Sequence, residues 1–226
     1  MQIFLLPFAG GSSASFNEMT KCLVPGIEPV AIDYSGRHTR SRDGYVTRYK
    51  EFLDDVVCQI KERRDGKPWA LLGYSLGSVL AFDIASKKLV DDLLCHVFVC
   101  ARGDLKSRSI SQRYAGLDDD EFAEKIVELG GFDERLLANK RFLDIYMKPV
   151  RNDYIVWWDY SFTDDGRKIP CDTSVIYCES DPLCDGVRTW DDLCDGCTDY
   201  YEMGDNHFFI RDHYADLAEI VNKKLI

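Results

Sequence analysis

The stretch Trp69-Ala-Leu-Leu-Gly-Tyr-Ser-Leu-Gly-Ser-Val-Leu-Ala-Phe-Asp83 decides the fold of this chain. Four mostly apolar residues lead into Gly73-Tyr-Ser-Leu-Gly77, and a helix-compatible segment follows at once. This strand–turn–helix context is typical of a nucleophile elbow, in which a sharp turn holds the central serine in a strained backbone conformation. No side chain fits two positions before or after that serine, and glycine occupies both positions here. We therefore predict that Ser75 is a nucleophile at a helix N-terminus, where free N–H groups favour an oxyanion.

Strand-like and helix-like segments alternate along most of the chain. Such alternation predicts a parallel sheet with right-handed crossovers. We expect one α/β domain over residues 1–226, with a mostly parallel central sheet flanked by helices. The expected strands besides the elbow strand are Gln2–Leu6, Glu28–Tyr34, His96–Ala101, Thr173–Cys178 and Thr198–Met203. The expected helices include Tyr45–Arg63, a short one at Val187–Leu193 and a C-terminal one from about Arg211.

The alternation stops between Arg102 and about Lys168, where no strand-like run occurs. Asp118–Leu129 has the pattern of an amphipathic helix that Gly130-Gly131 closes, and Asp133–Tyr146 is a second helical stretch. The aromatic-rich segment Met147–Phe162 follows. This region is either a helical subdomain with its own core or a lid whose apolar underside faces the substrate, and both descriptions are compatible. We expect a helical lid insertion at about residues 103–168.

Composition and charge exclude several classes of partner. The chain has 226 residues, and 28 Lys and Arg against 39 Asp and Glu give a formal charge of −11. This balance argues against binding to nucleic acid or to an anionic membrane surface. The start Met1–Leu6 lacks the basic region of a signal peptide, and no apolar run is long enough to span a bilayer. We expect a cytoplasmic monomer.

Nine cysteines occur, an odd number, and several of them fall in segments with the pattern of buried helix or strand (Cys58, Cys95, Cys100 and Cys178). Reduced intracellular thiols that act as small apolar side chains explain this usage. Cys194-Asp-Gly-Cys197 has a zinc-like spacing, but Cys184 lies ten residues away and no second such pair or paired histidine follows. We therefore expect neither a metal ion nor a bound cofactor.

An acid and a base follow the later strands. Asp181 comes after the strand Thr173–Cys178 and is fixed by Pro182, and His207 lies in a glycine-containing loop after the last strand. The other histidines, His38, His96 and His213, have less suitable positions. The order Ser75, Asp181, His207 is that of the α/β-hydrolase triad, in which histidine is the base and aspartate orients it.

Backbone N–H groups complete the predicted site. The segment Pro7-Phe-Ala-Gly-Gly-Ser-Ser-Ala-Ser-Phe16 follows the first strand, and α/β hydrolases take one oxyanion-binding N–H group from such a loop. A tight strand–helix turn with no chemistry has the same pattern. We predict that the oxyanion hole consists of the N–H groups of Leu76 and of Phe8 or Ala9.

Several separated motifs resemble those of the stand-alone type II thioesterases that serve nonribosomal peptide and polyketide synthases, over nearly the whole chain. Those motifs are Leu6-Pro-Phe-Ala-Gly-Gly-Ser12, Gly36-Arg-His-Thr-Arg40, Gly73–Gly77, Met147-Lys-Pro-Val-Arg-Asn-Asp153 and Gly204-Asp-Asn-His-Phe-Phe209. The resemblance implies hydrolysis of an acyl thioester on the phosphopantetheine arm of an acyl or peptidyl carrier protein, without a cofactor. We interpret Arg37 and Arg40 as supports of the sheet edge or lid.

The chain also departs from the family pattern. Tyr74 and Leu76 stand where histidine and methionine are common, and Ser35 replaces a proline. Cys178 takes the place of a common glycine before the acid, and Asp205-Asn206 replaces a glycine pair before the base. We expect the Asp205 carboxylate to face water. Editing and product release both stay open, as do three alternatives: a carboxylesterase on small free esters, an acyltransferase, and a binding protein without activity.

Overall fold

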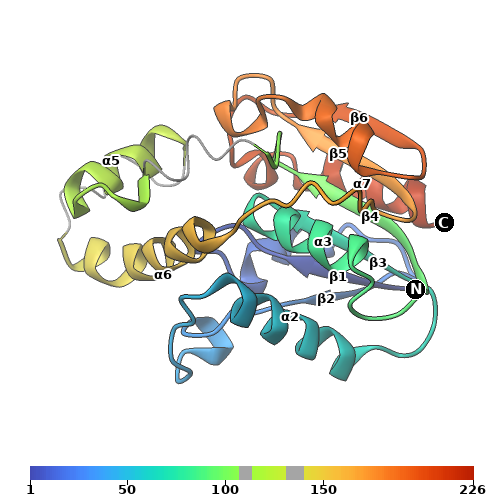
Figure 1. The fold of residues 1–226 in the computed structure, drawn as a ribbon, viewed down its shortest axis with the longest axis horizontal. Helices are drawn as coiled ribbons and strands as arrows, with labels where there is room; N and C mark the ends of the chain where they lie inside the picture. The colour runs from blue at the N-terminus through green and yellow to red at the C-terminus, as the bar shows by residue number, and fades with distance from the viewer. Residues whose placement is uncertain (107–113, 131–139) are drawn as a thin grey trace.

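The structure is a computed structural model that describes residues 1–106, 114–130 and 140–226, with only the backbone for 140–145. Figure 1 shows a central sheet covered by helices, with two further helices, α5 and α6, reaching to one side. The chain ends lie on the side of the molecule away from these two helices (Figure 1). In the described part of the chain, no helix is long and apolar enough to cross a membrane.

Within these ranges the sheet has six strands in the order β2-β1-β3-β4-β5-β6. Every neighbouring pair is parallel, which confirms the predicted α/β class with a mostly parallel sheet. The strands are β1 (Gln2–Leu6), β2 (Glu28–Ala31), β3 (Trp69–Tyr74), β4 (Leu94–Cys100), β5 (Asp172–Tyr177) and β6 (Thr198–Glu202).

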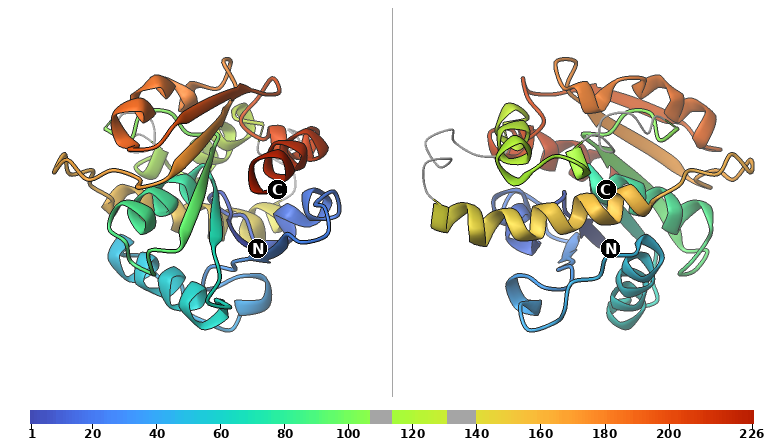
Figure 2. Two further views of the ribbon diagram at one scale, coloured as in Figure 1. Left: turned by 90° about the vertical axis from the view of Figure 1, so that its right-hand side faces the viewer. Right: turned by 60° about the vertical axis from the view of Figure 1, so that its left-hand side comes forward.

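Helices cover both faces of the sheet, as the views in Figure 2 show. One face carries α2 (Tyr49–Arg63) and α3 (Leu76–Ser86), and the other carries α1 (Asn17–Thr20) and α7 (Tyr214–Leu225). Successive strand residues therefore enter different cores: Phe4 packs with the first pair of helices, and Leu5 packs with the second. Burial on both faces explains why β1 and β3, inside the sheet, consist almost wholly of apolar residues.

The strand order places a crevice at one end of the sheet. From β1 the chain crosses to β2 on one side, and it continues with β3 on the other side of β1. The connections after β1 and β3 therefore diverge, and ligands of open α/β sheets bind at such a point, outside the carboxyl ends of the strands. The glycine-rich loop after β1 and the residue Ser75 after β3 both lie there.

The turn between β3 and α3 is as tight as the sequence predicts. Ser75 has φ of 54° and ψ of −106°, a conformation that few residues other than glycine adopt. A Cβ atom on Gly73 would lie 2.2 Å from the carbonyl oxygen of Gly77. A Cβ atom on Gly77 would lie 2.0 Å from the carbonyl oxygen of Leu6 in β1. Both positions therefore exclude a side chain, and α3 begins in direct contact with β1.

Between β4 and β5, the described residues include the helices α5 (Asp119–Glu128) and α6 (Lys140–Asp159). Asp118 caps α5, because its carboxylate accepts a hydrogen bond from the N–H group of Glu121 at 2.9 Å. The two helices share a small apolar cluster of their own, formed by Phe122, Ile126, Val150 and Tyr154. Figure 2 shows them crossing above the carboxyl end of the sheet.

Helix α2 begins at Tyr49, so the prediction of a start at Tyr45 was wrong. The side-chain amide of Asn152 donates to the carbonyl oxygen of Val46 at 2.9 Å, and the Asp159 carboxylate accepts from the N–H group of Tyr49 at 2.9 Å. These contacts with α6 hold residues 45–48 outside the helix. Tertiary contacts thus override an apolar period that continues into this segment.

The predicted end of the second helical stretch at Tyr146 is also wrong, because α6 continues through Pro149 to Asp159. A proline in a helix interior removes one hydrogen bond, but the apolar side chains of Val150, Tyr154 and Trp157 pack on one face of this helix. Residues 133–139 of the predicted stretch 133–146 lie outside the described part of the chain. Other ends differ as well: β2 stops at Ala31, and α7 starts at Tyr214 after a 3-10 turn. The short helix predicted at Val187–Leu193 is present with those bounds, as a 3-10 helix.

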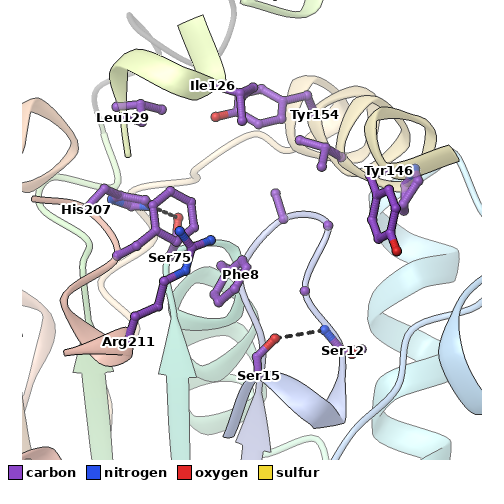
Figure 3. A pocket seen from close by; sticks show the side chains of 16 residues that line it. Phe8, Ser12, Ser15, Ser75, Ile126, Leu129, Tyr146, Tyr154, His207 and Arg211 are labelled. Carbon is purple, nitrogen blue, oxygen red and sulfur yellow. Dashed lines mark hydrogen bonds between the residues drawn. The ribbon is translucent and has the colours of Figure 1, made fainter. Parts of the chain in front are cut away.

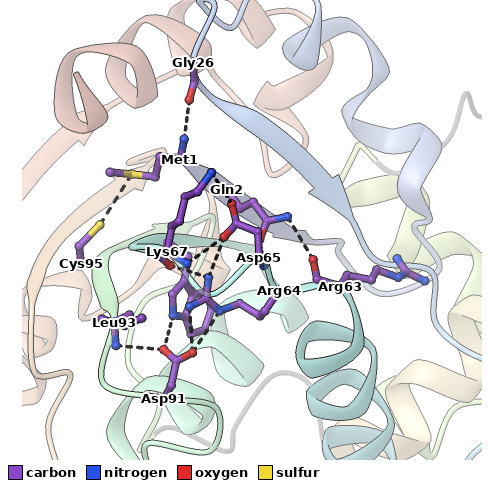
Figure 4. Close-up of polar contacts among 11 residues, drawn as sticks. Met1, Gln2, Gly26, Arg63, Arg64, Asp65, Lys67, Asp91, Leu93 and Cys95 are labelled. Carbon is purple, nitrogen blue, oxygen red and sulfur yellow. Dashed lines mark hydrogen bonds and ion pairs between the residues drawn. The ribbon is translucent and has the colours of Figure 1, made fainter.

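Polar contacts close the opposite end of the sheet, where β1 and β3 begin (Figure 4). The amino group of Met1 donates to the carbonyl oxygen of Gly26 at 2.6 Å. The Trp69 indole donates to Asp91 at 2.7 Å, and Arg64 donates to the same carboxylate at 2.8 Å. These hydrogen bonds satisfy polar groups at the amino ends of the strands, whereas the candidate site lies at the carboxyl ends.

The contact between α3 and β1 can be tested with alanine at Gly77. The added Cβ atom meets a backbone oxygen, which cannot rotate away, so we expect Gly77→Ala to reduce the free energy of unfolding by at least about 2 kcal/mol. Gly44→Ala is the matched control, since a Cβ atom there meets nothing within 4 Å, and we expect a change below about 0.5 kcal/mol. Urea denaturation of both variants measures the difference, and equal stabilities would contradict the proposed close approach.

Candidate active site

Three loops at the carboxyl end of the sheet bring Ser75, His207 and Asp181 together. The Nε2 atom of His207 lies 3.1 Å from the Ser75 hydroxyl, and its Nδ1 atom lies 2.6 Å from an Asp181 carboxylate oxygen. All three residues are buried. Figure 3 shows the contact between Ser75 and His207 at the base of a cavity. This is the arrangement in which Nδ1 donates to a carboxylate and Nε2 accepts the proton of a serine hydroxyl.

Asp181 is held ionised by its hydrogen-bond donors. Burial opposes its charge, but hydrogen bonds and the nearby His207 imidazole outweigh burial and lower the pKa of the carboxyl. The other donors are the N–H group of Leu183 at 2.9 Å and the thiol of Cys184 at 3.3 Å. At neutral pH the carboxylate is therefore available to orient the imidazole and to stabilise its protonated form.

Tyr74 fixes the loop that carries His207. Its side chain is fully buried, and its hydroxyl donates to the backbone carbonyl oxygen of His207 at 2.8 Å. The same hydroxyl accepts from the N–H group of Ile210 at 3.4 Å. The residue before the nucleophile thus ties the elbow to the loop of the base, a role that the sequence did not predict.

The loop after β1 leaves two N–H groups for an oxyanion. The N–H group of Gly10 donates to Asp153 at 2.7 Å, and that of Gly11 donates to the carbonyl oxygen of Phe8 at 2.8 Å. Among the described residues, the N–H groups of Phe8 and Ala9 have no such acceptor. Leu76 is the first residue of α3, where N–H groups lack an acceptor within the helix. The predicted donors therefore surround Ser75, and their role stays a prediction.

A cavity of about 150 Å³ opens over these residues. Its walls come from the loop after β1, from α5 and α6, and from the loop of His207, and Figure 3 shows Ile126, Leu129 and Tyr154 facing Ser75 across it. The underside of the two helices is therefore apolar where it faces the nucleophile. The helices α5 and α6 have a small core of their own and also form the roof of this cavity, and their role as a lid over the substrate stays a prediction.

Comparison with known proteins identifies the family of this chain. The model of the thioesterase domain family matches residues 1–225. The chain belongs to this family. Thioesterases are hydrolases, so membership supports enzymatic activity and confirms the predicted resemblance.

Individual relatives agree with this assignment. The gramicidin S biosynthesis protein GrsT of Aneurinibacillus migulanus is 23% identical over 231 residues, which cover 100% of this chain and 89% of GrsT. The crystal structure of ClbQ, from the colibactin NRPS/PKS pathway, is 26% identical with a TM-score of 0.87 and coverage of 99% and 96%. The type II thioesterase BorB, from the borrelidin biosynthetic cluster, is 22% identical with a TM-score of 0.85 and coverage of 100% and 92%. The α/β-hydrolase fold is thereby confirmed.

Within this thioesterase-family chain, Arg37 joins the loop after β1 to the roof of the cavity. Its guanidinium binds both carboxylate oxygens of Asp153 in α6 and donates to the carbonyl oxygen of Gly11 at 3.4 Å. The side chains of Arg37 and Asp153 are 6% and 0% exposed. Because Asp153 also accepts from the N–H group of Gly10, one buried ion pair sets the position of the loop after β1 against α6. Arg40 instead pairs with Asp55 of α2.

The remaining histidines lie elsewhere. His38 contacts Asp33 at 3.0 Å, His96 contacts Ser174 at 3.0 Å, and His213 contacts Asp216 at 2.9 Å. Asp205 is exposed, as expected. All nine cysteines are free. Among the residues that the structure describes, no three His, Cys, Asp or Glu side chains are grouped so that they could hold a metal ion.

Sequence patterns indicated Arg37 as a support of the sheet edge or lid, but they missed its partner Asp153 and the roles of Tyr74 and Cys184. The pairing of Arg37 with Asp153 joins two of the quoted motifs, but their separation by 116 positions hides the contact. The hydroxyl of Tyr74 and the thiol of Cys184 act on backbone or carboxylate atoms that only the folded chain brings near them. The signal for Arg37 was its motif, whereas Tyr74 and Cys184 had none.

The buried ion pair predicts a large effect of removing one partner. Arg37→Met leaves the Asp153 carboxylate buried without its countercharge, so we expect the free energy of unfolding to fall by about 3–5 kcal/mol. The control is Lys21→Met, which breaks an exposed pair with Glu18 and is expected to change stability little. Guanidinium denaturation compares the two, and an Arg37→Met variant as stable as wild type would contradict this account.

The buried His96 predicts a loss of stability in mild acid. Burial, with a contribution from nearby Lys224, lowers its pKa to about 4 from the ordinary value of 6.5. Between these values the unfolded chain binds a proton that the folded protein does not, so stability from this residue is present above pH 6.5 and is lost toward pH 4. His96→Gln removes this linkage and can still bind Ser174. Urea denaturation at about pH 7 and at about pH 4.5 measures the free energy of unfolding, which should fall less between these pH values in the variant than in wild type. Equal falls in the two proteins would contradict the prediction.

Proposed function

We propose that this chain is a serine thioesterase that hydrolyses acyl groups from the phosphopantetheine arm of carrier proteins in nonribosomal peptide or polyketide synthesis. One observation supports it above the others: a buried hydrogen-bonded chain from Asp181 through His207 to Ser75, at the base of a roofed cavity. Membership of the thioesterase family, and relatives such as the type II thioesterase BorB, support the type of bond and the pathway.

In the proposed first step, Ser75 attacks the thioester carbonyl carbon while its proton passes to Nε2 of His207. The carbonyl oxygen gains negative charge and is bound by the N–H groups of Leu76 and of Phe8 or Ala9; one such donor contributes about 10²–10³ in rate. The imidazolium then gives its proton to the leaving sulfur as the carbon–sulfur bond breaks. The products are an ester on Ser75 and a free pantetheine thiol.

In the second step, water replaces the hydroxyl of Ser75. The oxygen of the water molecule attacks the ester carbonyl carbon while His207 takes a proton from that water. His207 then gives the proton to the oxygen of Ser75 when the ester bond breaks. The acid is released and the enzyme is restored. Asp181 stays ionised throughout, because its role is to hold the imidazole and stabilise its charged form. The reaction uses no cofactor.

The proposal extends to the setting of the reaction. We infer a single hydrolase domain over residues 1–226 with its lid at about 103–168, acting as a monomer in the cytoplasm on an acyl or peptidyl carrier protein. Nine free thiols suit a reducing compartment, and the formal charge of −11 disfavours nucleic acid or an anionic membrane as partner.

Replacing the nucleophile tests the reaction type. Ser75→Ala removes the attacking oxygen but leaves the buried shell intact, so we expect kcat on an acyl-loaded carrier protein to fall by at least about 10⁴. Thermal unfolding should stay close to that of wild type. Ser41→Ala is the control, since Ser41 is exposed and outside the site. Intact-mass analysis of the carrier protein measures the rate, and normal turnover by Ser75→Ala would disprove the mechanism.

A second comparison tests the carrier-protein substrate against a small-ester hydrolase. The same acyl group is presented once on a carrier protein and once as a small aryl ester. Contacts with the carrier protein and its arm should raise kcat/KM for the thioester, although the aryl ester is chemically more reactive. A higher kcat/KM for the aryl ester would favour a carboxylesterase. Transfer of the acyl group to an added amine or alcohol, in place of water, would favour an acyltransferase.

A further inference from the structure

Tyr154 of α6 brings an enclosed hydroxyl group into the roof of the cavity over Ser75. The residue is 8% exposed, and in the described part of the chain no group forms a hydrogen bond with its hydroxyl. Figure 3 shows the ring reaching across the roof, with the hydroxyl at the end directed toward Leu129. Because Tyr154 lines the cavity, this hydroxyl is available to a bound substrate.

The surroundings of this hydroxyl are apolar. Ile126 and Leu129 of α5 and Val150 of α6 line the same part of the cavity. The ring of Tyr154 packs edge-on against Phe122, with the ring centres 5.2 Å apart, so packing fixes the place of the hydroxyl. Burial raises the pKa of Tyr154, and the hydroxyl is therefore a neutral donor and acceptor. An enclosed hydroxyl without a partner costs free energy, which a hydrogen bond to a substrate would recover.

The position of His207 indicates on which side of Ser75 the pantetheine arm lies. In the proposed first step the imidazole gives a proton to the leaving sulfur, so the sulfur lies on the side of Ser75 that His207 occupies. Phe208 and Arg211 continue the cavity wall on that side, and Arg211 is exposed. The arm therefore extends from the sulfur along this wall toward solvent, where its carrier protein remains.

Tyr154 faces this path from the roof. Figure 3 shows Leu129 on the same side of the cavity as His207, and the hydroxyl of Tyr154 is directed toward Leu129. The first polar group of a pantetheine arm beyond its sulfur is an amide, which a short carbon link joins to the sulfur. An amide offers an N–H donor and a carbonyl acceptor, and a tyrosine hydroxyl can pair with either of them.

We propose that the hydroxyl of Tyr154 binds the amide of the pantetheine arm that lies nearest to the thioester. This inference rests on the proposed thioesterase function, and it assigns a contact to the part of the substrate that all acyl groups share. The hydrogen bond holds the carbon–sulfur bond in place between Ser75 and His207 for the first step. It plays no part in the second step, because the thiol has then left. Tyr154 is thus a substrate-binding residue that acts on acylation alone.

The test uses Tyr154→Phe, which removes the hydroxyl and keeps the ring, with one acyl group presented in three ways. The first substrate is a carrier protein with a normal arm, and the second is the same carrier protein with a CH2–CH2 unit in place of that amide. The third is a small aryl ester, which forms the same acyl-enzyme without an arm. We expect Tyr154→Phe to lower kcat/KM for the normal arm by about 3- to 10-fold, and for the other two substrates by less than about 2-fold.

Tyr160→Phe is the matched control. The hydroxyl of Tyr160 is also buried without a partner among the described residues, but Tyr160 does not line the cavity. Its kcat/KM for all three substrates should equal that of wild type. Thermal unfolding of both variants checks folding. Wild type itself should hydrolyse the normal arm at least about 3-fold better than the altered arm, which tests the proposal even if Tyr154→Phe does not fold.

Each outcome has a distinct meaning. Equal wild-type kcat/KM for the two arms, or no loss in Tyr154→Phe, overturns the inference about Tyr154 while the thioesterase function stands. A loss that also extends to the altered arm or to the aryl ester overturns it too, because the hydroxyl then serves the acyl group, the attacking water or the fold. If wild type hydrolyses the acyl group from neither carrier protein, the proposed function itself fails.

Discussion

The contact between the backbone of α3 and the backbone of β1 is the constraint on which the site depends. Gly77 allows the first turn of α3 to approach the carbonyl oxygen of Leu6, where a Cβ atom would lie 2.0 Å away. The same tight turn holds Ser75 in its unusual conformation and makes Leu76 the first residue of α3. The proposed nucleophile and the proposed oxyanion donor Leu76 are thus positioned by main-chain packing, which does not relax as a surface side chain does.

A buried ion pair extends this rigidity to the roof of the cavity. Asp153 of α6 binds Arg37 and the N–H group of Gly10 together, so the oxyanion loop and the insertion are held as one unit. Tyr74 does the same for the loop of His207 through a single buried hydroxyl. In the proposed mechanism, the geometry of Ser75 and His207 therefore depends on groups outside the triad, and a preorganised site of this kind would stabilise charge without reorganisation during the reaction.

The fold and the meeting of three distant side chains could be predicted, because apolar runs in the sequence mark where each strand ends. Ser75, Asp181 and His207 each follow an apolar run, and the carboxyl ends of parallel strands meet at one edge of a sheet. The start of α2 at Tyr49 was not predictable, since Asn152 and Asp159 impose it from a helix more than a hundred residues away. The passage of α6 through Pro149 depends likewise on packing partners that periodicity does not reveal.

The activation of Ser75 by His207 is the central claim, and fluorophosphonate labelling followed by peptide mapping tests it most directly. The reagent forms a covalent bond with a serine hydroxyl only when a nearby base activates that hydroxyl. The account predicts a single label on Ser75 in the wild-type protein, its loss in a folded His207→Ala variant, and protection by acyl-loaded carrier protein. A label on another residue, or equal labelling of Ser75 without the imidazole, would contradict it.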